Sequence, residues 1–195
     1  MIDINYQVKF YDMDSNVVFR KTKERFGGLS NMCSGYPITI GDFVFLTSES
    51  LYQCCRFNND ADIQKIIINE KSPISSKMKS KKYRSRTRDD WYSVRVDIMD
   101  WCIRMKLKSN WKKFSELLLC TVDKQIVEES HKDQFWGCVK NKDQMLEGAN
   151  VLGQLLTNLR DEIKMGIVKE EYVSMKRVNN MRFFDKSIYD LLGVQ

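Results

Sequence analysis

The chain has 195 residues, which suits one domain with a real core, because a chain of this size buries roughly 70% of its unfolded surface. It contains a single histidine, which excludes an HExxH site and any site that needs two imidazoles. Its six cysteines include no CxxC pair, so buried thiols are expected rather than disulfides or a metal site.

The net charge of +6 arises in one short stretch. Seven Lys and Arg residues lie between Lys77 and Arg88 with no acid among them, and the rest of the chain sums to 6 − 7 = −1. Such a stretch, here called the basic segment, predicts either a surface that contacts phosphate, including that of DNA, or a solvated, mobile loop. Both interpretations stay open at this point.

No apolar run approaches the roughly 18 residues that span a bilayer, and the N-terminal sequence MIDINYQVKF lacks the pattern of a signal peptide. We therefore expect an intracellular, cytoplasmic protein with no membrane partner.

The N-terminal third reads as short strands and a tight loop. Alternation of apolar and polar residues at 2–11 and 16–20 predicts two half-buried strands that form a hairpin or small sheet. Two adjacent glycines in the 26–31 stretch predict a tight loop with close backbone approach. Residues 36–40 and 43–45 predict a second pair of strands, joined at Gly41 and Asp42.

The stretch 47–57 combines a helix start with an acid and a polar stripe. Thr47 or Ser48 is a suitable N-cap, which places Glu49 in the first turn, where free N–H groups favour a carboxylate. Glu49, Gln53 and Arg56 share one helix face at spacings of four and three. The simplest interpretation is a surface ion pair between Glu49 and Arg56; a preorganised functional acid is the alternative.

The next helices follow from spacing and caps. A short helix is expected at 61–69, Pro73 is expected to break the pattern, and Thr87 is a candidate cap with Asp90 in the capping-box position. An amphipathic helix with a core-facing stripe is expected from Trp91 to Met105, and a shorter helix from Asn110.

Beyond residue 121, a short strand around 126–127 leads to acids and Trp136, which predicts a pocket wall or a surface loop anchored by that tryptophan. A strong helix is expected from 148–150 to a stop at Gly166. The remaining residues, 167–195, predict one or two modest helices packed on the outside.

The order of several short motifs is more specific than any one of them. They are GLSN at 28–31, YPI at 36–38, TSE at 47–49, Gln53, Lys77, Trp91 with Arg95 and Met99, LLCT at 118–121, VE at 127–128, DxxWG at 133–137, GxNxLGxLL at 148–156, and Arg160. Together they resemble the NADAR family, the YbiA-like group named for NAD and ADP-ribose, over roughly residues 19–163.

The resemblance implies an α+β fold, a helix-dominated single domain with a small antiparallel sheet from the N-terminal third. This domain would cover residues 1–166, with 167–195 as a helical extension. It also implies an N-glycosidase that cleaves a bond between ribose C1 and nitrogen, without metal or cofactor. The implied substrates are ADP-ribosyl-guanine in DNA, or a phosphoribosylated pyrimidine intermediate of riboflavin synthesis.

The resemblance assigns roles to particular residues. Glu49 would stabilise positive charge on the sugar, and Asp133 would orient water or the ribose hydroxyls. Lys77 or Lys106 would capture the opened sugar as a Schiff base. The implied substrate-binding residues are Gly28, Ser30, Asn31, Gln53, Arg56, Trp91, Arg95, Glu128, Trp136, Gly137, Asn150 and Gly153.

Three positions depart from the family pattern: Ser50 stands in place of histidine, Arg56 near a usual lysine, and Val139 in place of a glycine. Because an arginine cannot form a Schiff base, an alternative is a catalytically silent module that binds ADP-ribose or NAD. A nucleic-acid-binding module that uses the basic segment is a third possibility.

Overall fold

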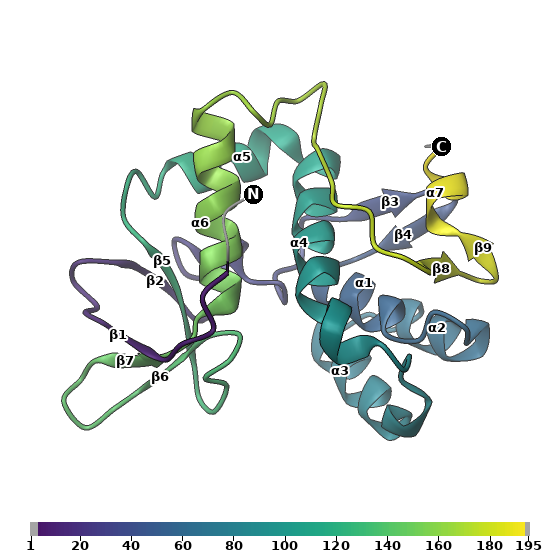
Figure 1. Ribbon diagram of the computed structural model, residues 1–195, viewed down its shortest axis with the longest axis horizontal. Coiled ribbons are helices and arrows are strands. Elements are labelled where there is room, and N and C mark those ends of the chain that lie inside the picture. Colours follow the sequence, from purple (N-terminus) through teal and green to yellow (C-terminus); the bar gives the residue numbers. More distant parts are fainter. Residues whose placement is uncertain (1–3, 194–195) are drawn as a thin grey trace. The chain divides into compact units, whose positions relative to one another are not determined.

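A computed structural model describes residues 4–193 of the chain (Figure 1). Its contacts divide the chain into two compact units, each built from two segments. The sheet unit combines the chain up to Ser30 with Trp111–Val173, and the helical unit combines Asn31–Asn110 with the chain from Ser174 onward. Helices outweigh strands, which confirms the predicted α+β class. Among the described residues, no helix is long and apolar enough to cross a membrane.

The sheet unit contains a five-stranded sheet in the order β1-β7-β6-β5-β2. Its strands are β1 (Lys9–Tyr11), β2 (Val17–Phe19), β5 (Ile126–Ser130), β6 (Cys138–Lys140) and β7 (Leu146–Gly148). Strand β5 pairs in parallel with both β2 and β6, whereas β7 pairs antiparallel with β1 and β6. Helix α6 (Val151–Lys164) packs against β5 and α5 (Trp111–Leu119), and α5 contacts the short 3₁₀ helix η1 (Gly27–Leu29).

The predicted hairpin between residues 2–11 and 16–20 is wrong. Strand β1 pairs with β7, and β2 pairs with β5, more than one hundred residues away. Alternation reports only that one face of a strand is buried, so it does not identify the neighbouring strand. Residues 2 and 3 of the predicted strand lie outside the described part of the chain.

The helical unit is organised around α1 (Ser48–Cys55), which packs against α2 (Ala61–Ile68), α3 (Pro73–Lys82) and α4 (Trp91–Ser109). The predicted hairpin is present as β3 (Ile38–Ile40) and β4 (Phe43–Phe45), with Gly41 at a positive φ of 54° in the turn. The unit also contains η2 (Arg84–Arg86), β8 (Arg182–Phe183), β9 (Lys186–Ser187) and α7 (Ile188–Leu191).

The loop alternative for the basic segment is wrong, because the segment is helical over much of its length. Pro73 follows the break after α2 and occupies the first turn of α3, where its missing N–H costs nothing. Thr87 does not cap α4, whose N-cap is Asp90 without a side-chain hydrogen bond.

Helix α4 is less amphipathic than its sequence stripe predicts. Ile98, Trp101, Cys102 and Met105 of the stripe are buried as expected, but Lys106 and other residues outside the stripe are buried as well. The C-terminal half of α4 is thus enclosed on more than one face. Neighbours that are distant in sequence cover it, and periodicity does not report them.

The C-terminal residues form little helix. Among the described residues beyond 166 the structure has one four-residue helix, α7, and the two-residue strands β8 and β9. Gln64 of α2 holds this segment, since its Nε2 donates to Arg182 O at 2.8 Å and its Oε1 accepts from Phe184 N at 2.8 Å. We keep the domain division at residue 166 as a proposal; residues 194 and 195 lie outside the description.

Thiol reactivity tests the packing. Five cysteines are buried and Cys120 is exposed. Burial raises the pKa of the Cys54 and Cys102 thiols well above the ordinary value and that of Cys138 to about 12, so these groups stay protonated at neutral pH. We expect one fast equivalent of maleimide labelling in the native protein and none in Cys120→Ser. Two or more fast equivalents would contradict the packing.

Candidate functional site

The N-terminus of α1 is closed by a reciprocal capping box. The Thr47 side chain accepts a hydrogen bond from Ser50 N at 3.2 Å, and Ser50 Oγ accepts one from Thr47 N at 3.3 Å. Thr47 is therefore the cap, one of the two predicted residues. Ser50, which departs from the family pattern, completes the box, so a small hydroxyl at this position has a structural role here.

Glu49 is a buried carboxylate in the first turn of α1, and only 5% of the residue is exposed. Its Oε1 accepts a hydrogen bond from Gln53 Nε2 at 3.0 Å and lies 3.5 Å from Lys77 Nζ. Among the described residues, nothing donates a hydrogen bond to Oε2. The predicted surface pair of Glu49 with Arg56 is wrong, because the carboxylate is buried and Lys77 is its cationic neighbour.

Gln53 is also buried, with 5% exposed, and its amide orientation follows from its neighbour. A carboxylate only accepts hydrogen bonds, so the amide NH₂ faces Glu49 and the amide oxygen points away from it. This oxygen is a buried polar atom that finds no donor within the described part of the chain. Leaving a buried acceptor unpaired costs about 1–3 kcal/mol, so this atom needs an explanation.

Asn31 connects the preceding loop to the start of α1. Its backbone oxygen accepts from Glu49 N at 3.0 Å, and its Oδ1 accepts from Ser48 Oγ at 3.1 Å. Its Nδ2 lies 2.9 Å from Met99 Sδ of α4. Asn31 is predicted to bind substrate. In the structure its backbone carbonyl pairs with the N–H of Glu49, one of the groups that a helix start leaves without a partner in the helix.

Arg56 is held away from Glu49 by two other contacts. Its Nε donates to Thr87 Oγ1 at 2.8 Å, and its guanidinium carbon lies 5.2 Å from the centre of the Trp91 ring. Trp91 is 4% exposed, and its ring lies 4.9 Å from the Tyr52 ring. Burial raises the pKa of Tyr52 well above its ordinary value, and the charge of Glu49 adds to this rise. Trp91 is therefore a core residue in this structure, and Thr87 is a partner that the sequence did not reveal.

The two candidate lysines differ in environment. Lys77 lies on the exposed side of α3 with its Nζ at the edge of the Glu49 carboxylate. Lys106 is 1% exposed, and its Nζ lies 4.6 Å from the centre of the Tyr36 ring, a cation–π contact. Arg95, a predicted substrate contact, lies over the exposed Tyr92 ring at 5.3 Å.

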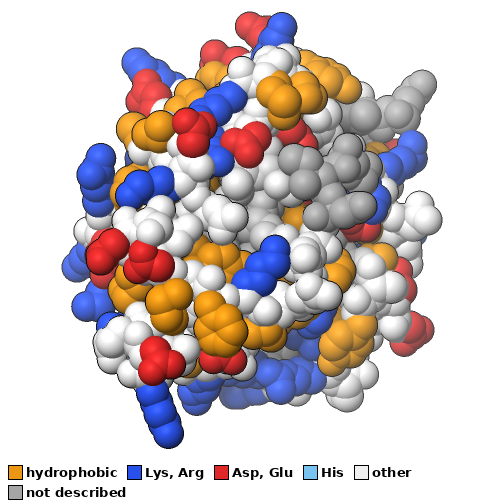
Figure 2. All heavy atoms as spheres, turned by 60° about the vertical axis from the view of Figure 1, so that its left-hand side comes forward, with side chains coloured by type: hydrophobic (Ala, Val, Ile, Leu, Met, Phe, Trp, Pro, Cys, Tyr) orange, Lys and Arg blue, Asp and Glu red, His pale blue; other side chains and the backbone are white. Residues whose placement is uncertain are grey.

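Most cations of the basic segment have acidic partners from outside it. Besides Lys77 with Glu49, the pairs are Lys79 with Glu70 at 2.6 Å, Arg86 with Asp60 at 2.6 Å, and the buried Arg88 with Asp90. The local charge count in the sequence therefore overstates the free positive charge of this surface. Figure 2 shows Lys and Arg side chains gathered along the lower edge of one face of the molecule.

In the sheet unit, Asp133 organises a turn. It is exposed, and its Oδ1 accepts from Phe135 N at 2.9 Å and Trp136 N at 2.8 Å. The carbonyls of the same two residues accept from Val151 N and Leu152 N, each at 3.0 Å. The first N–H groups of α6 are thus paired by this turn, which leaves them unavailable to a phosphate.

Asn150 and two glycines fix α6 on β5. Asn150 caps α6 with a positive φ of 52°; its Oδ1 accepts from Glu128 N at 3.1 Å and its Nδ2 donates to Ile126 O at 2.8 Å. A Cβ on Gly153 would lie 2.1 Å from Ile126 O, and one on Gly137 would lie 2.6 Å from Glu128 O. These close approaches to β5 account for both glycines without a ligand.

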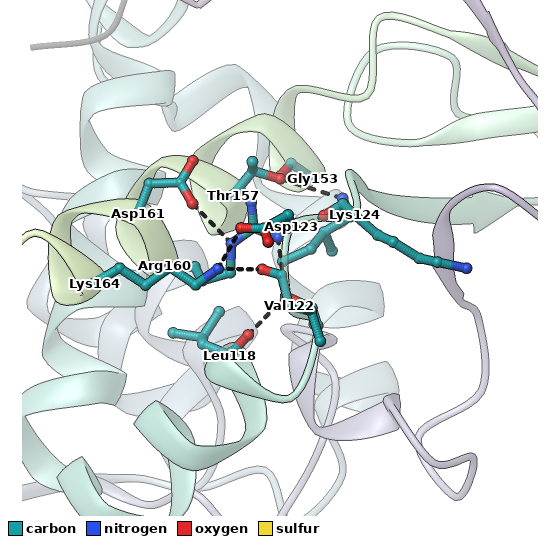
Figure 3. Close-up of polar contacts among 11 residues, drawn as sticks. Leu118, Val122, Asp123, Lys124, Gly153, Thr157, Arg160, Asp161 and Lys164 are labelled. Atoms are coloured by element: carbon teal, nitrogen blue, oxygen red, sulfur yellow. Dashed lines mark hydrogen bonds and ion pairs between the residues drawn. The ribbon is translucent and has the colours of Figure 1, made fainter.

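The remaining predicted residues also have structural contacts. Gly28 lies in η1, and Ser30 N donates to Gly27 O at 3.1 Å. Arg160, part of the motif series, is buried on α6 and donates to Thr121 Oγ1 at 3.1 Å and to Lys124 O, while it pairs with Asp161 (Figure 3). The motif at 118–121 and Arg160 are therefore joined by the hydrogen bond between Arg160 and Thr121.

Two variants of Asp133 test its turn-forming role. Asp133→Asn keeps the oxygen acceptor, so we expect the free energy of unfolding in urea to change little. Asp133→Ala leaves two N–H groups without this acceptor and should lower that free energy by about 1 kcal/mol, as the loss of a helix cap does. The exposed Asp143→Ala is the control. Equal stability of Asp133→Ala and the parent would contradict the turn-forming role.

Comparisons with known proteins identify the family. The NADAR domain model matches residues 18–164. An N-glycosidase of Nostoc punctiforme is 33% identical over 150 residues, covering 76% of this chain and 92% of that protein. A riboflavin biosynthesis protein of Vibrio vulnificus is 31% identical over 161 residues, covering 82% of this chain. A chloroplastic riboflavin biosynthesis protein of Zea mays is 34% identical over 165 residues, covering 77% of it.

The matched regions cover only 41% of the Vibrio protein and 26% of the maize protein. Among solved structures, the NMR structure of the E. coli protein YbiA matches with a TM-score of 0.65 and 25% identity, covering 80% of this chain and 90% of YbiA. The motif order, the fold and the family model agree. The chain belongs to the NADAR domain family.

Proposed function

We propose that this protein is an N-glycosidase that cleaves the bond between C1 of a ribose and a base nitrogen in an anionic ribosyl nucleotide. The observation that carries the proposal is the buried Glu49 carboxylate, held by Gln53 and Lys77 at the start of α1. The membership of this chain in the NADAR domain family and the N-glycosidase name of the Nostoc relative support the same reaction type.

The chemistry requires a fixed negative charge. As the C1–N bond breaks, its electron pair leaves with the nitrogen and positive charge develops on the sugar. A carboxylate already oriented beside C1 stabilises this state more than the ground state, because it pays no reorganisation cost during the reaction. Water then supplies hydroxide to C1 and a proton to the departing base. Glu49 has one oxygen occupied and one without a hydrogen bond from the described residues, which suits this role.

Lys77 is the lysine that we assign to the sugar. Its ammonium lies beside Glu49. Once the ring opens, transfer of a proton from this ammonium to the Glu49 carboxylate frees the amine to add to the C1 aldehyde. Loss of water then gives an imine, and hydrolysis of the imine returns both the lysine and the sugar. Arg56 does not weaken this assignment, because it makes its hydrogen bond to Thr87 and lies over Trp91. Lys106 is the second candidate.

The alternative of a catalytically silent binder was based on Arg56 and Val139. Val139 lies in β6, where it pairs with Glu147 of β7 and Ser130 of β5. Neither Arg56 nor Val139 is among the residues that contact the Glu49 carboxylate. We therefore place the enzyme first.

Two substrates are candidates. The names of the Vibrio and maize relatives favour the phosphoribosylated pyrimidine intermediate of riboflavin synthesis. ADP-ribosyl-guanine in DNA stays the other candidate, but the paired charges weaken the argument for a DNA-binding basic segment. Among the described residues, carboxylate partners are absent only for Lys81, Lys82 and Arg84 of that segment.

A variant of Glu49 tests the carboxylate. Glu49→Gln removes the charge and nearly preserves the shape, so we expect a folded protein whose base release falls at least about a hundredfold, the scale of one lost electrostatic stabiliser. Both candidate substrates are supplied, and free base and sugar phosphate are measured by chromatography. The control is Glu70→Gln, which removes another acid paired with a lysine of α3. Parent-level activity in Glu49→Gln would refute the assignment.

Reductive trapping of the imine tests the assignment of Lys77. Borohydride added during turnover reduces an imine to a stable secondary amine, so mass spectrometry of peptides should find the sugar on Lys77. Lys77→Arg keeps the charge beside Glu49 but cannot form the imine, and it should give no adduct. Lys79→Arg, two residues along α3 at a lysine that pairs with Glu70 instead of Glu49, is the control. An adduct on Lys106 alone would transfer the role to that residue.

A further inference from the structure

Gln53 Oε1 is the buried side-chain polar atom that the described part of the chain leaves without a hydrogen-bond partner. We infer that Gln53 is a specificity-determining residue whose Oε1 accepts a hydrogen bond from the ribose hydroxyl next to C1. The site would then select ribosides over 2-deoxyribosides. This inference rests on the proposed function, because it takes Glu49 to lie against C1.

The contact between Gln53 and Glu49 determines which kind of group can pair with Gln53 Oε1. The hydrogen bond from Gln53 Nε2 to Glu49 Oε1, at 3.0 Å, prevents the amide from turning its oxygen toward the carboxylate, since two acceptors would then face each other. Oε1 therefore requires a donor, an O–H or N–H group. The described residues around it provide none.

The neighbouring carboxylate indicates where the donor belongs. Glu49 Oε2 is a second acceptor without a hydrogen bond from the described residues, and Glu49 and Gln53 are in direct contact. A molecule with adjacent donors satisfies both acceptors at once. We assign the C2 hydroxyl to Gln53 because it lies on the carbon next to C1, which the proposed function sets against Glu49, the direct neighbour of Gln53.

Selection against the deoxy sugar follows from the same argument. A ligand without the hydroxyl leaves a buried acceptor unpaired in the complex, and sites built to bind a hydroxyl reject analogues that lack it. A bound water on Oε1 would give no such selection. The two explanations therefore predict different sugar preferences.

The experiment measures binding of ribose 5-phosphate and 2-deoxyribose 5-phosphate by calorimetry, so that neither the base nor the reactivity of the glycosidic bond contributes. We expect the parent protein to bind the ribose compound about tenfold or more tightly than the deoxy compound. In Gln53→Met, which has similar volume and no acceptor oxygen, we expect the two sugars to bind within about twofold of each other. Gln125→Met, at an exposed glutamine, should keep the parent preference.

Equal affinity of the parent for both sugars would overturn the inference and indicate a structural water on Oε1. Failure of both to bind at millimolar concentration would also overturn it, as would a preserved preference in Gln53→Met. The parent measurement needs no variant, so it stands even if Gln53→Met fails to fold. A protein that distinguishes the sugars but releases no base from either nucleotide would keep this inference and end the glycosidase proposal.

Discussion

The burial of the Glu49 carboxylate is the constraint on which much of the helical unit depends. A charged group that leaves water must be compensated by hydrogen bonds and opposite charge. Here the compensation comes from the first turn of α1, the amide of Gln53 and the ammonium of Lys77. Asn31 and the Thr47 capping box hold that turn in place. The position of α3 is thereby coupled to the electrostatics of α1.

The same principle governs the basic segment. Lys79 of α3 and Arg86 of η2 reach Glu70 and Asp60, acids that precede the segment, and so contribute to the attachment of α3 and η2 within the helical unit. Partly exposed pairs of this kind are individually weak, but they remove positive charge that would otherwise attract phosphate. A dense run of Lys and Arg in a sequence is therefore consistent with a helix that is mainly structural.

In the sheet unit, β5 has the central role. Asn150 bonds to its backbone at two points, and Gly153 and Gly137 approach it too closely for any larger side chain. The Asp133 turn pairs the first N–H groups of α6, and Arg160 ties the other end of that helix to the segment before β5. Several motifs that resemble binding features thus have a packing explanation, which concentrates the chemical argument on Glu49, Gln53 and Lys77.

The sequence alone determined a cap at Thr47 or Ser48, the helix that carries Glu49, the hairpin turn at Gly41 and Gly166 just beyond the end of α6, where its φ is 69°. Each of these depends on neighbours within a few residues. The motif order also indicated the family. Only the tertiary structure decided the neighbours of β1 and β2 in the sheet and the acids that pair with the basic segment. It also showed that the cation beside Glu49 is Lys77 and not Arg56. The partners of β1 and β2 lie more than one hundred positions away in the sequence, and the paired acids lie two to 28 positions from their cations. Hydrophobic periodicity and charge counts carry no information about which of these groups meet.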